Sequence, residues 1–186
     1  KIIRAYLVNS GDYVFLDETI GDKTVIEHLE SYALNWENLS NYGKPGYIDE
    51  TYKLADFGES AVNLLECVPT YVHIVPSFNI GYVWMMRETA KLHLQRGNQD
   101  KAEILESKAD QMAENILELY AGNGAWYSLY PNNKKVEVRH VLDFIYFGKF
   151  LANDVTPQVK QEMMNFLNNE LKTDLWMRAQ SLQDIA

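Results

Sequence analysis

With 186 residues, the chain is most simply one domain, long enough to bury a sizeable hydrophobic core. Hydrophobic residues make up 47% and charged residues 23%, which is ordinary for a soluble globular protein. A formal net charge of -9, with no cluster of Lys or Arg, opposes binding to nucleic acid or to anionic membranes. The single cysteine, Cys67, excludes an internal disulfide and a cysteine-based zinc cluster.

The first part of the chain is predicted to be helical. Residues 2–9 indicate a helix, and a short helix should follow from Asp12, as its cap, to about Thr19. Asp22 is expected to cap the next helix, over residues 22–39, whose apolar side chains recur at helical spacing.

The middle of the chain predicts a long loop and then a helical hairpin. Gly, Pro and polar residues at 40–53 favour a loop, and long ordered loops in compact domains are often functional. Apolar periodicity predicts helices at 78–96 and 100–120, with Asp100 and Glu103 as a possible capping box. The short connection between these helices predicts an antiparallel pair.

The last part of the chain predicts one β-hairpin and two more helices. Residues 125–130 and 135–139 should pair as short strands, and helices should cover 141–152 and 157–171, the second capped by Thr156. We therefore expect an all-α fold with at most one short β-hairpin, and a sheet of three or more strands would contradict it.

Several common functional motifs are absent from the sequence. There is no glycine-rich phosphate loop, zinc spacing or G-x-S-x-G element, and the four histidines show no metal-ligand spacing. We therefore expect neither a metal ion nor another cofactor.

The stretch from Lys53 to Leu94 is the best candidate for function. It begins with an acidic residue beside an aromatic ring and a glycine, Asp56-Phe57-Gly58, and continues through a run rich in Tyr, His, Asn and Pro. It then becomes a core helix from about Ser77. A polar loop on the end of a core helix is a common place to present binding groups.

Five phrases, in order along nearly the whole chain, resemble the six-hairpin glycosidases. This superfamily includes α-L-rhamnosidase-like and glucosidase-like bacterial enzymes. The matching phrases are Tyr6 to Leu16, Leu54-Ala55-Asp56-Phe57-Gly58, the helix Asn79 to Lys91, Val138 to Phe144, and Trp176-Met177-Arg178-Ala179.

The resemblance implies a glycoside hydrolase with an (α/α)6 toroid of twelve helices. The chain would supply about half of that toroid, as a partial catalytic domain, and both of its ends look cut from something longer. Its open flank should then expose apolar side chains and favour self-association. Without a second carboxylate, the chain alone should be inactive on its carbohydrate substrate. A periplasmic or extracellular location is favoured over a cytoplasmic one.

The resemblance also implies the residues of a sugar site. Asp56 would be a catalytic carboxylate or a ligand of sugar hydroxyls, although it could equally cap a helix that begins near Ser60. The candidate substrate-binding residues are Asn79, Trp126, Arg139, His140, Asp143, Trp176 and Arg178. The alternatives are core packing for the two tryptophans and a local salt-bridge cluster for the charged residues.

A second function from another class is a non-catalytic α-helical domain that binds sugar or, like a solenoid, another protein. A solenoid should show a repeat of about 34 residues, and this chain shows none. Convergence of Asp56, Trp126, Arg139 and Arg178 at one end of the fold would favour the sugar site, whereas scatter over the surface would favour an interaction domain.

Overall fold

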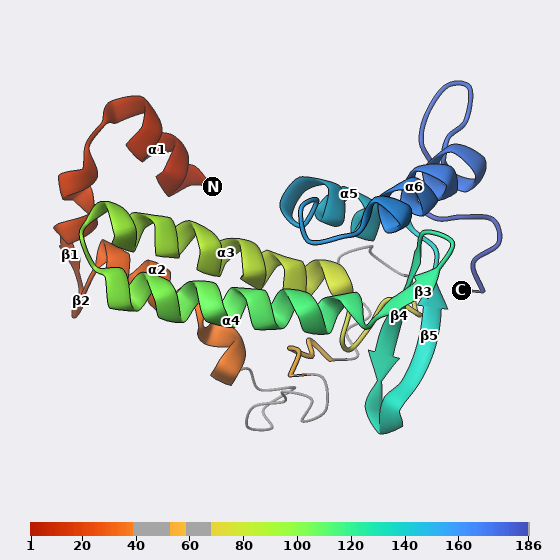
Figure 1. Cartoon of the computed structure of the whole chain (residues 1–186), viewed down its shortest axis with the longest axis horizontal. Helices are drawn as coiled ribbons and strands as arrows, with labels where there is room; N and C mark the ends of the chain where they lie inside the picture. Colours follow the sequence, from red (N-terminus) through yellow and green to blue (C-terminus); the bar gives the residue numbers. More distant parts are fainter. Residues whose placement is uncertain (39–52, 59–67, 186) are drawn as a thin grey trace.

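The computed structural model describes residues 1–38, 53–58 and 68–185. Cys67 and all but the last residue of the predicted loop at 40–53 lie outside these ranges. The centre of the molecule is a pair of long antiparallel helices, α3 (Pro76–Gln95) and α4 (Gln99–Leu117) (Figure 1). One end of this pair carries the N-terminal elements, and the other carries a sheet and the two C-terminal helices.

The predicted hairpin of α3 and α4 is confirmed. The turn between the helices uses Gly97 at φ +75°, a conformation that glycine adopts without steric cost. The N–H of Asn98 donates to the carbonyl of His93 at 2.9 Å and closes the end of α3. The predicted capping box of Asp100 and Glu103 is wrong, because α4 begins at Gln99 and its N-cap position is therefore Asn98.

The N-terminal elements lie around the end of the hairpin where the α3–α4 turn lies, and the last of them reaches back to the middle of α4, where Glu37 pairs with Lys108. They are α1 (Ile2–Ser10), a 3-10 helix η1 (Tyr13–Asp17), strands β1 (Thr19–Ile20) and β2 (Lys23–Thr24), α2 (Val25–Ala33) and a 3-10 turn η2 (Asn35–Asn38). Asp12 caps η1, as predicted, by accepting from the N–H of Phe15.

Asp22 does not cap α2, so that prediction is wrong. Gly21, at φ +69°, and Asp22 form the two-residue turn that joins β1 to β2. Thr24 takes the cap instead, in a reciprocal capping box with Glu27.

A three-stranded antiparallel sheet lies where α3 begins and α4 ends (Figure 1). Its order is β3 (Tyr120–Gly122), β4 (Ala125–Tyr130) and β5 (Lys134–Val138). The predicted pairing of the last two strands is confirmed, with Trp126 opposite Val138. The added strand β3 pairs Tyr120 with Trp126.

The expected all-α fold, with helical hairpins from an incomplete (α/α)6 toroid, is therefore wrong. The described residues form a mixed α and β structure with one two-stranded and one three-stranded antiparallel sheet. The physical cause is a run of three residues with positive φ: Gly122, Asn123 and Gly124. They reverse the chain tightly enough for β3 to pair with β4.

Two helices complete the fold beside the sheet: α5 (Val141–Phe150) and α6 (Pro157–Phe166). Thr156 caps α6 and Pro157 occupies its first position, as predicted. A π-helical turn, η4 (Leu167–Leu171), follows directly. The tail then crosses back to the start of α5, where the N–H of Val141 donates to the carbonyl of Ala179 at 2.8 Å.

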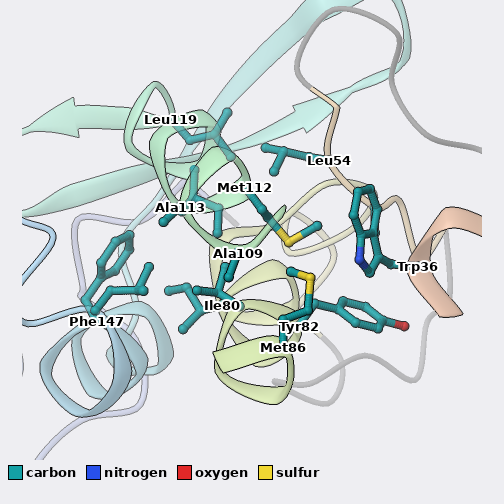
Figure 2. Packing of buried hydrophobic residues seen from close by; sticks show 14 of the residues in the cluster. Trp36, Leu54, Ile80, Tyr82, Met86, Ala109, Met112, Ala113, Leu119 and Phe147 are labelled. Carbon is teal, nitrogen blue, oxygen red and sulfur yellow. The ribbon is translucent and has the colours of Figure 1, made fainter. Parts of the chain in front are cut away.

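The main hydrophobic core lies between α3, α4 and α5 (Figure 2). Ile80 and Met86 of α3 face Ala109 and Met112 of α4, and all four are buried. The core continues to Phe147 on one side and to Trp36 and Leu54 on the other. It therefore reaches the sheet end of the hairpin, where the polar groups described next are anchored.

Candidate functional site

Polar side chains from three separated parts of the sequence meet around the first turn of α3. Asn79 belongs to this turn and bonds to the backbone next to Asp56. Asp143, which lies beside His140 at the start of α5, accepts from Ser77 of the same turn. All five residues are buried. The starts of α3 and α5 lie at the sheet end of the α3–α4 hairpin (Figure 1).

Asp56 is only 2% exposed and has two polar partners within the described residues. Its Oδ1 accepts a hydrogen bond of 2.6 Å from the N–H of Gly58, and its Oδ2 lies 3.2 Å from Nδ1 of His73. The alternative helix that Asp56 would cap, beginning near Ser60, lies outside the described residues. The contact with His73 is a buried acid–base pair, an arrangement suited to moving a proton.

His73 is the residue that sequence reasoning missed. Its backbone is left-handed, with φ +64°, which is uncommon for any residue other than glycine. The N–H of His73 donates to the carbonyl of Gly58 at 2.9 Å, and its carbonyl accepts from the N–H of Phe57 at 3.3 Å. Its ring lies 5.1 Å from that of Tyr130. Strained backbone of this kind clusters at functional sites.

Asn79 joins the Asp56 segment to α3. Its Oδ1 accepts from the N–H of Ala55 at 2.8 Å, and its Nδ2 donates to the carbonyls of Ala55 at 3.0 Å and Val75 at 3.1 Å. These bonds use most of what a buried amide side chain can make. In this structure Asn79 therefore fixes the chain next to Asp56 and has little capacity left for a sugar hydroxyl.

Asp143 reaches from α5 to the start of α3. Its Oδ1 accepts from the hydroxyl of Tyr71 and from the N–H of Ser77, both at 3.1 Å. Its Oδ2 lies 3.3 Å from Nε2 of His140. The Tyr71 hydroxyl also makes a very short contact with that of Ser77. Burial, and then the charge of Asp143, raise the pKa of Tyr71 well above its usual value, so the phenol stays protonated and donates.

His140 has a defined tautomer in this network. Its Nδ1 accepts from the N–H of Leu142 at 3.1 Å, so the side chain of His140 caps the N-terminus of α5. The neutral ring therefore carries its proton on Nε2, which faces Asp143 but makes no well-aligned hydrogen bond with the described residues. The ring packs edge-on against Tyr71, with centroids 4.1 Å apart.

Arg139 and Arg178 both contact Glu170, Arg139 as part of an ionic cluster and Arg178 through the backbone. Arg139 Nε donates to Glu170 Oε2 at 2.8 Å, and its guanidinium also pairs with Glu137. Hydrogen bonding from Arg139 lowers the pKa of Glu170. Arg178 donates to the backbone carbonyl of Glu170 at 3.2 Å. These contacts match the salt-bridge alternative for Arg139, whereas the contact of Arg178 is a hydrogen bond to the backbone.

The two candidate tryptophans lie in opposite environments. Trp126 is buried and stacks on Phe147, with centroids 3.7 Å apart, so it is part of the core. Trp176 is 68% exposed, on a turn closed by hydrogen bonds to the Thr173 side chain. Only Trp176 offers an open ring face on which a sugar could stack.

Within residues 1–38, 53–58 and 68–185, no helix combines the length and hydrophobicity needed to cross a membrane. The same residues bring together no group of three His, Cys, Asp or Glu side chains that could hold a metal ion.

The geometry thus defines a class of site: a buried carboxylate–imidazole pair beside the start of a core helix. A comparison with models of known protein families gives no match, and neither does a comparison with curated proteins.

Proposed function

We propose that this chain is part of a glycoside hydrolase and that Asp56 is one of its two catalytic carboxyl groups. The corrected fold class gives this proposal no support, so it rests on the resemblance of the sequence phrases and on the site. The observation that carries it is the buried contact of Asp56 with His73, whose backbone is strained. If Asp56 only capped a helix, it would not need a histidine in a left-handed conformation beside it. A catalytic acid benefits from a histidine that is held in a fixed position next to it.

The chemistry requires two carboxyl groups on either side of the glycosidic bond, about 6.5–9.5 Å apart in inverting enzymes. Asp56 would protonate the leaving oxygen or accept from a sugar hydroxyl. Asp143 is not the second catalytic carboxyl group, because both oxygens of Asp143 face other protein groups in the interior. Since the Asp56 carboxyl is covered, substrate would reach it only after a movement of the chain around it.

The test is hydrolysis of a panel of aryl glycosides by the full-length protein and by its Asp56→Asn variant. The isosteric amide keeps the hydrogen bond from Gly58 but cannot give up a proton, so turnover should fall by about 10²-fold or more. Asp22→Asn makes the same chemical change in the exposed β1–β2 turn and should leave turnover unchanged. Equal turnover by Asp56→Asn and the parent protein would reject the assignment.

The second candidate function is sugar or protein binding without catalysis. It is favoured by Trp176, whose exposed ring stands on a turn that side-chain bonds hold in shape. Calorimetric titration with oligosaccharides separates the two functions. Binding that Trp176→Ala abolishes and Asp56→Asn leaves intact, without hydrolysis, would favour the binding domain.

Self-association is a further part of the proposal. Three apolar side chains near the N-terminal end, Ile2, Val8 and Val14, are strongly exposed. Exposed apolar patches often mark association surfaces. Sedimentation equilibrium should show a dimer or larger species, and the variant Val8→Lys should weaken it. A monomer at all concentrations would reject self-association.

A further inference from the structure

We propose that Asp143 is a positioning residue: from α5 it fixes both ends of residues 71–77 and so holds the His73 imidazole against Asp56. Only the kinetic arm of the test below rests on the proposed function. The structural arm holds for this arrangement of residues whatever the protein acts on.

The first step is the way that Asp143 completes the start of α3. The N-cap residue of α3, Val75, has no side chain that can accept a hydrogen bond, so the first N–H groups of the helix need another partner. Asp143 supplies it from a different helix, by accepting from the N–H of Ser77 at 3.1 Å. Its negative charge also suits the positive end of the α3 dipole.

The second step is that the same carboxylate holds the other end of the segment. Tyr71, six residues before Ser77, donates its hydroxyl to the same Oδ1 at 3.1 Å. The Ser77 hydroxyl closes the loop by its short contact with the Tyr71 hydroxyl. Residues 71 and 77 are thus tied together through one oxygen atom, with residues 72–76 between them.

The third step concerns the middle of the segment. Ile74 exchanges two backbone hydrogen bonds with Leu129 of β4, at 3.2 and 2.8 Å. His73 itself is bonded through its backbone to Phe57 and Gly58. A left-handed histidine persists only where its surroundings leave no relaxed alternative, and here the chain is held on both sides of it.

The consequence is an arrangement in which a change at Asp143 or Tyr71 acts on Asp56 through His73. If one end of the segment is released, residues 71–73 can relax towards an ordinary extended backbone. The side chain of His73 would then leave its position 3.2 Å from Oδ2 of Asp56. Asp143 would therefore affect the site without touching a substrate.

The structural arm follows the ring signals of His73 by 1H–13C NMR, assigned by their absence in His73→Asn. Tyr71→Phe removes only one hydroxyl group, and Asp143→Asn replaces an acceptor oxygen by a donor facing His140. Both should displace the His73 ring signals. Thr156→Ala is the matched control, because it weakens the fold by removing a helix cap elsewhere, and it should leave these signals in place.

The kinetic arm uses the full-length protein and measures kcat and KM on the aryl glycoside that the full-length parent hydrolyses. Displacing a catalytic group by about 1 Å costs on the order of 10²-fold in rate, so Tyr71→Phe should lower kcat with little change in KM. Thr156→Ala should change neither constant below its unfolding temperature.

The outcomes separate the two proposals. Displaced His73 signals without hydrolysis by any full-length variant, the full-length parent included, would leave Asp143 as a positioning residue and reject the proposed function. His73 signals that stay in place in folded Tyr71→Phe would overturn the positioning role, whatever the activity. Tyr71→Phe decides the matter even if Asp143→Asn does not fold.

Discussion

Arg87 of α3 donates two hydrogen bonds to Asp154, from Nη1 at 3.0 Å and from Nη2 at 2.7 Å. The pair links the central helix to the turn between α5 and α6, and Nη2 also donates to Asp110 of α4 at 2.8 Å. These hydrogen bonds raise the pKa of Arg87 above its already high value, so it stays charged at any working pH. Both partners in the main pair are largely shielded from water.

Replacing Arg87 by Lys should lower the free energy of unfolding by about 1–2 kcal/mol. The ammonium group of Lys cannot reproduce the planar two-point contact with a carboxylate. Urea unfolding measures the change. Arg4→Lys is the control, because Arg4 pairs with Glu88 at an exposed position, where such pairs contribute about 0–1 kcal/mol. Equal losses in the two variants would show that the geometry of the Asp154 contact is unimportant.

Gly124→Ala should be among the most damaging single substitutions in the described part of the chain. A Cβ at this position would lie 2.6 Å from both the Glu162 carbonyl and Cβ of Phe166, on a backbone with φ +81°. We expect a loss of about 3 kcal/mol or more, from strain and overpacking together.

Gly21→Ala isolates the strain from the clash. Gly21 has φ +69°, but a Cβ there would meet nothing within 4 Å. Its loss should stay near 1–2 kcal/mol, the cost of a left-handed alanine. Thermal unfolding of both variants measures the difference. Similar losses for Gly124→Ala and Gly21→Ala would mean that the turn between β3 and β4 moves away from α6 easily enough to admit the methyl group.

His93 should make the protein less stable in acid. It is buried where α2, α3 and α4 meet, and burial lowers its pKa, an effect that Glu30 opposes and that Lys101 and Arg96 increase. Below the ordinary histidine pKa of about 6.5, the unfolded chain therefore binds a proton that the folded protein resists. The contribution of His93 is constant above that pH and becomes destabilising as the pH falls below it.

His93→Leu tests this pH dependence. Neither ring nitrogen makes a hydrogen bond within the described residues, although Nε2 lies 3.4 Å from Glu30, so little is lost at neutral pH. Urea unfolding between pH 8 and pH 5 should show a flatter decline for the variant than for the parent protein. Parallel curves would exclude His93 as a source of acid sensitivity.

Trp126→Ala should lower the free energy of unfolding by about 3–5 kcal/mol, the range for removing a large ring from a packed core. Its stacking on Phe147 makes the loss a packing effect. Trp176→Ala is the matched change at an exposed ring and should stay within about 0.5 kcal/mol. Differential scanning calorimetry of the two variants measures both. A small loss at Trp126 would reopen its role as a sugar platform.

The helices could be predicted because the apolar residues of each helix recur at helical spacing within one continuous stretch of sequence. In α4, the apolar residues Ala102, Leu105, Ala109 and Met112 recur at helical spacing and are all buried. Strand β3 could not be predicted in this way, because three residues ending in glycine are too short to show alternation. It becomes a strand only through its pairing with β4.

The site was less accessible to sequence reasoning than the helices. Asp56, Asn79, His140 and Asp143 were singled out by resemblance, and the structure brings them to one end of the hairpin. Their partners could not be named, because Tyr71 and Ser77 lie 72 and 66 residues from Asp143. The left-handed backbone of His73 has no sequence signal, since it results from the contacts around it.

The turn at Gly97 and the long-range contacts of Asp143 imply an order of events during folding. The α3–α4 hairpin closes through a few residues and can form early, whereas contacts 66 and 72 residues apart carry a larger loop-closure entropy and should form late. A weakened Tyr71–Asp143 contact should therefore accelerate unfolding more than it slows refolding. The carboxylate–imidazole pair would then open before the α3–α4 hairpin and assemble after it, so hydrogen exchange at His73 should exceed exchange in the middle of α4.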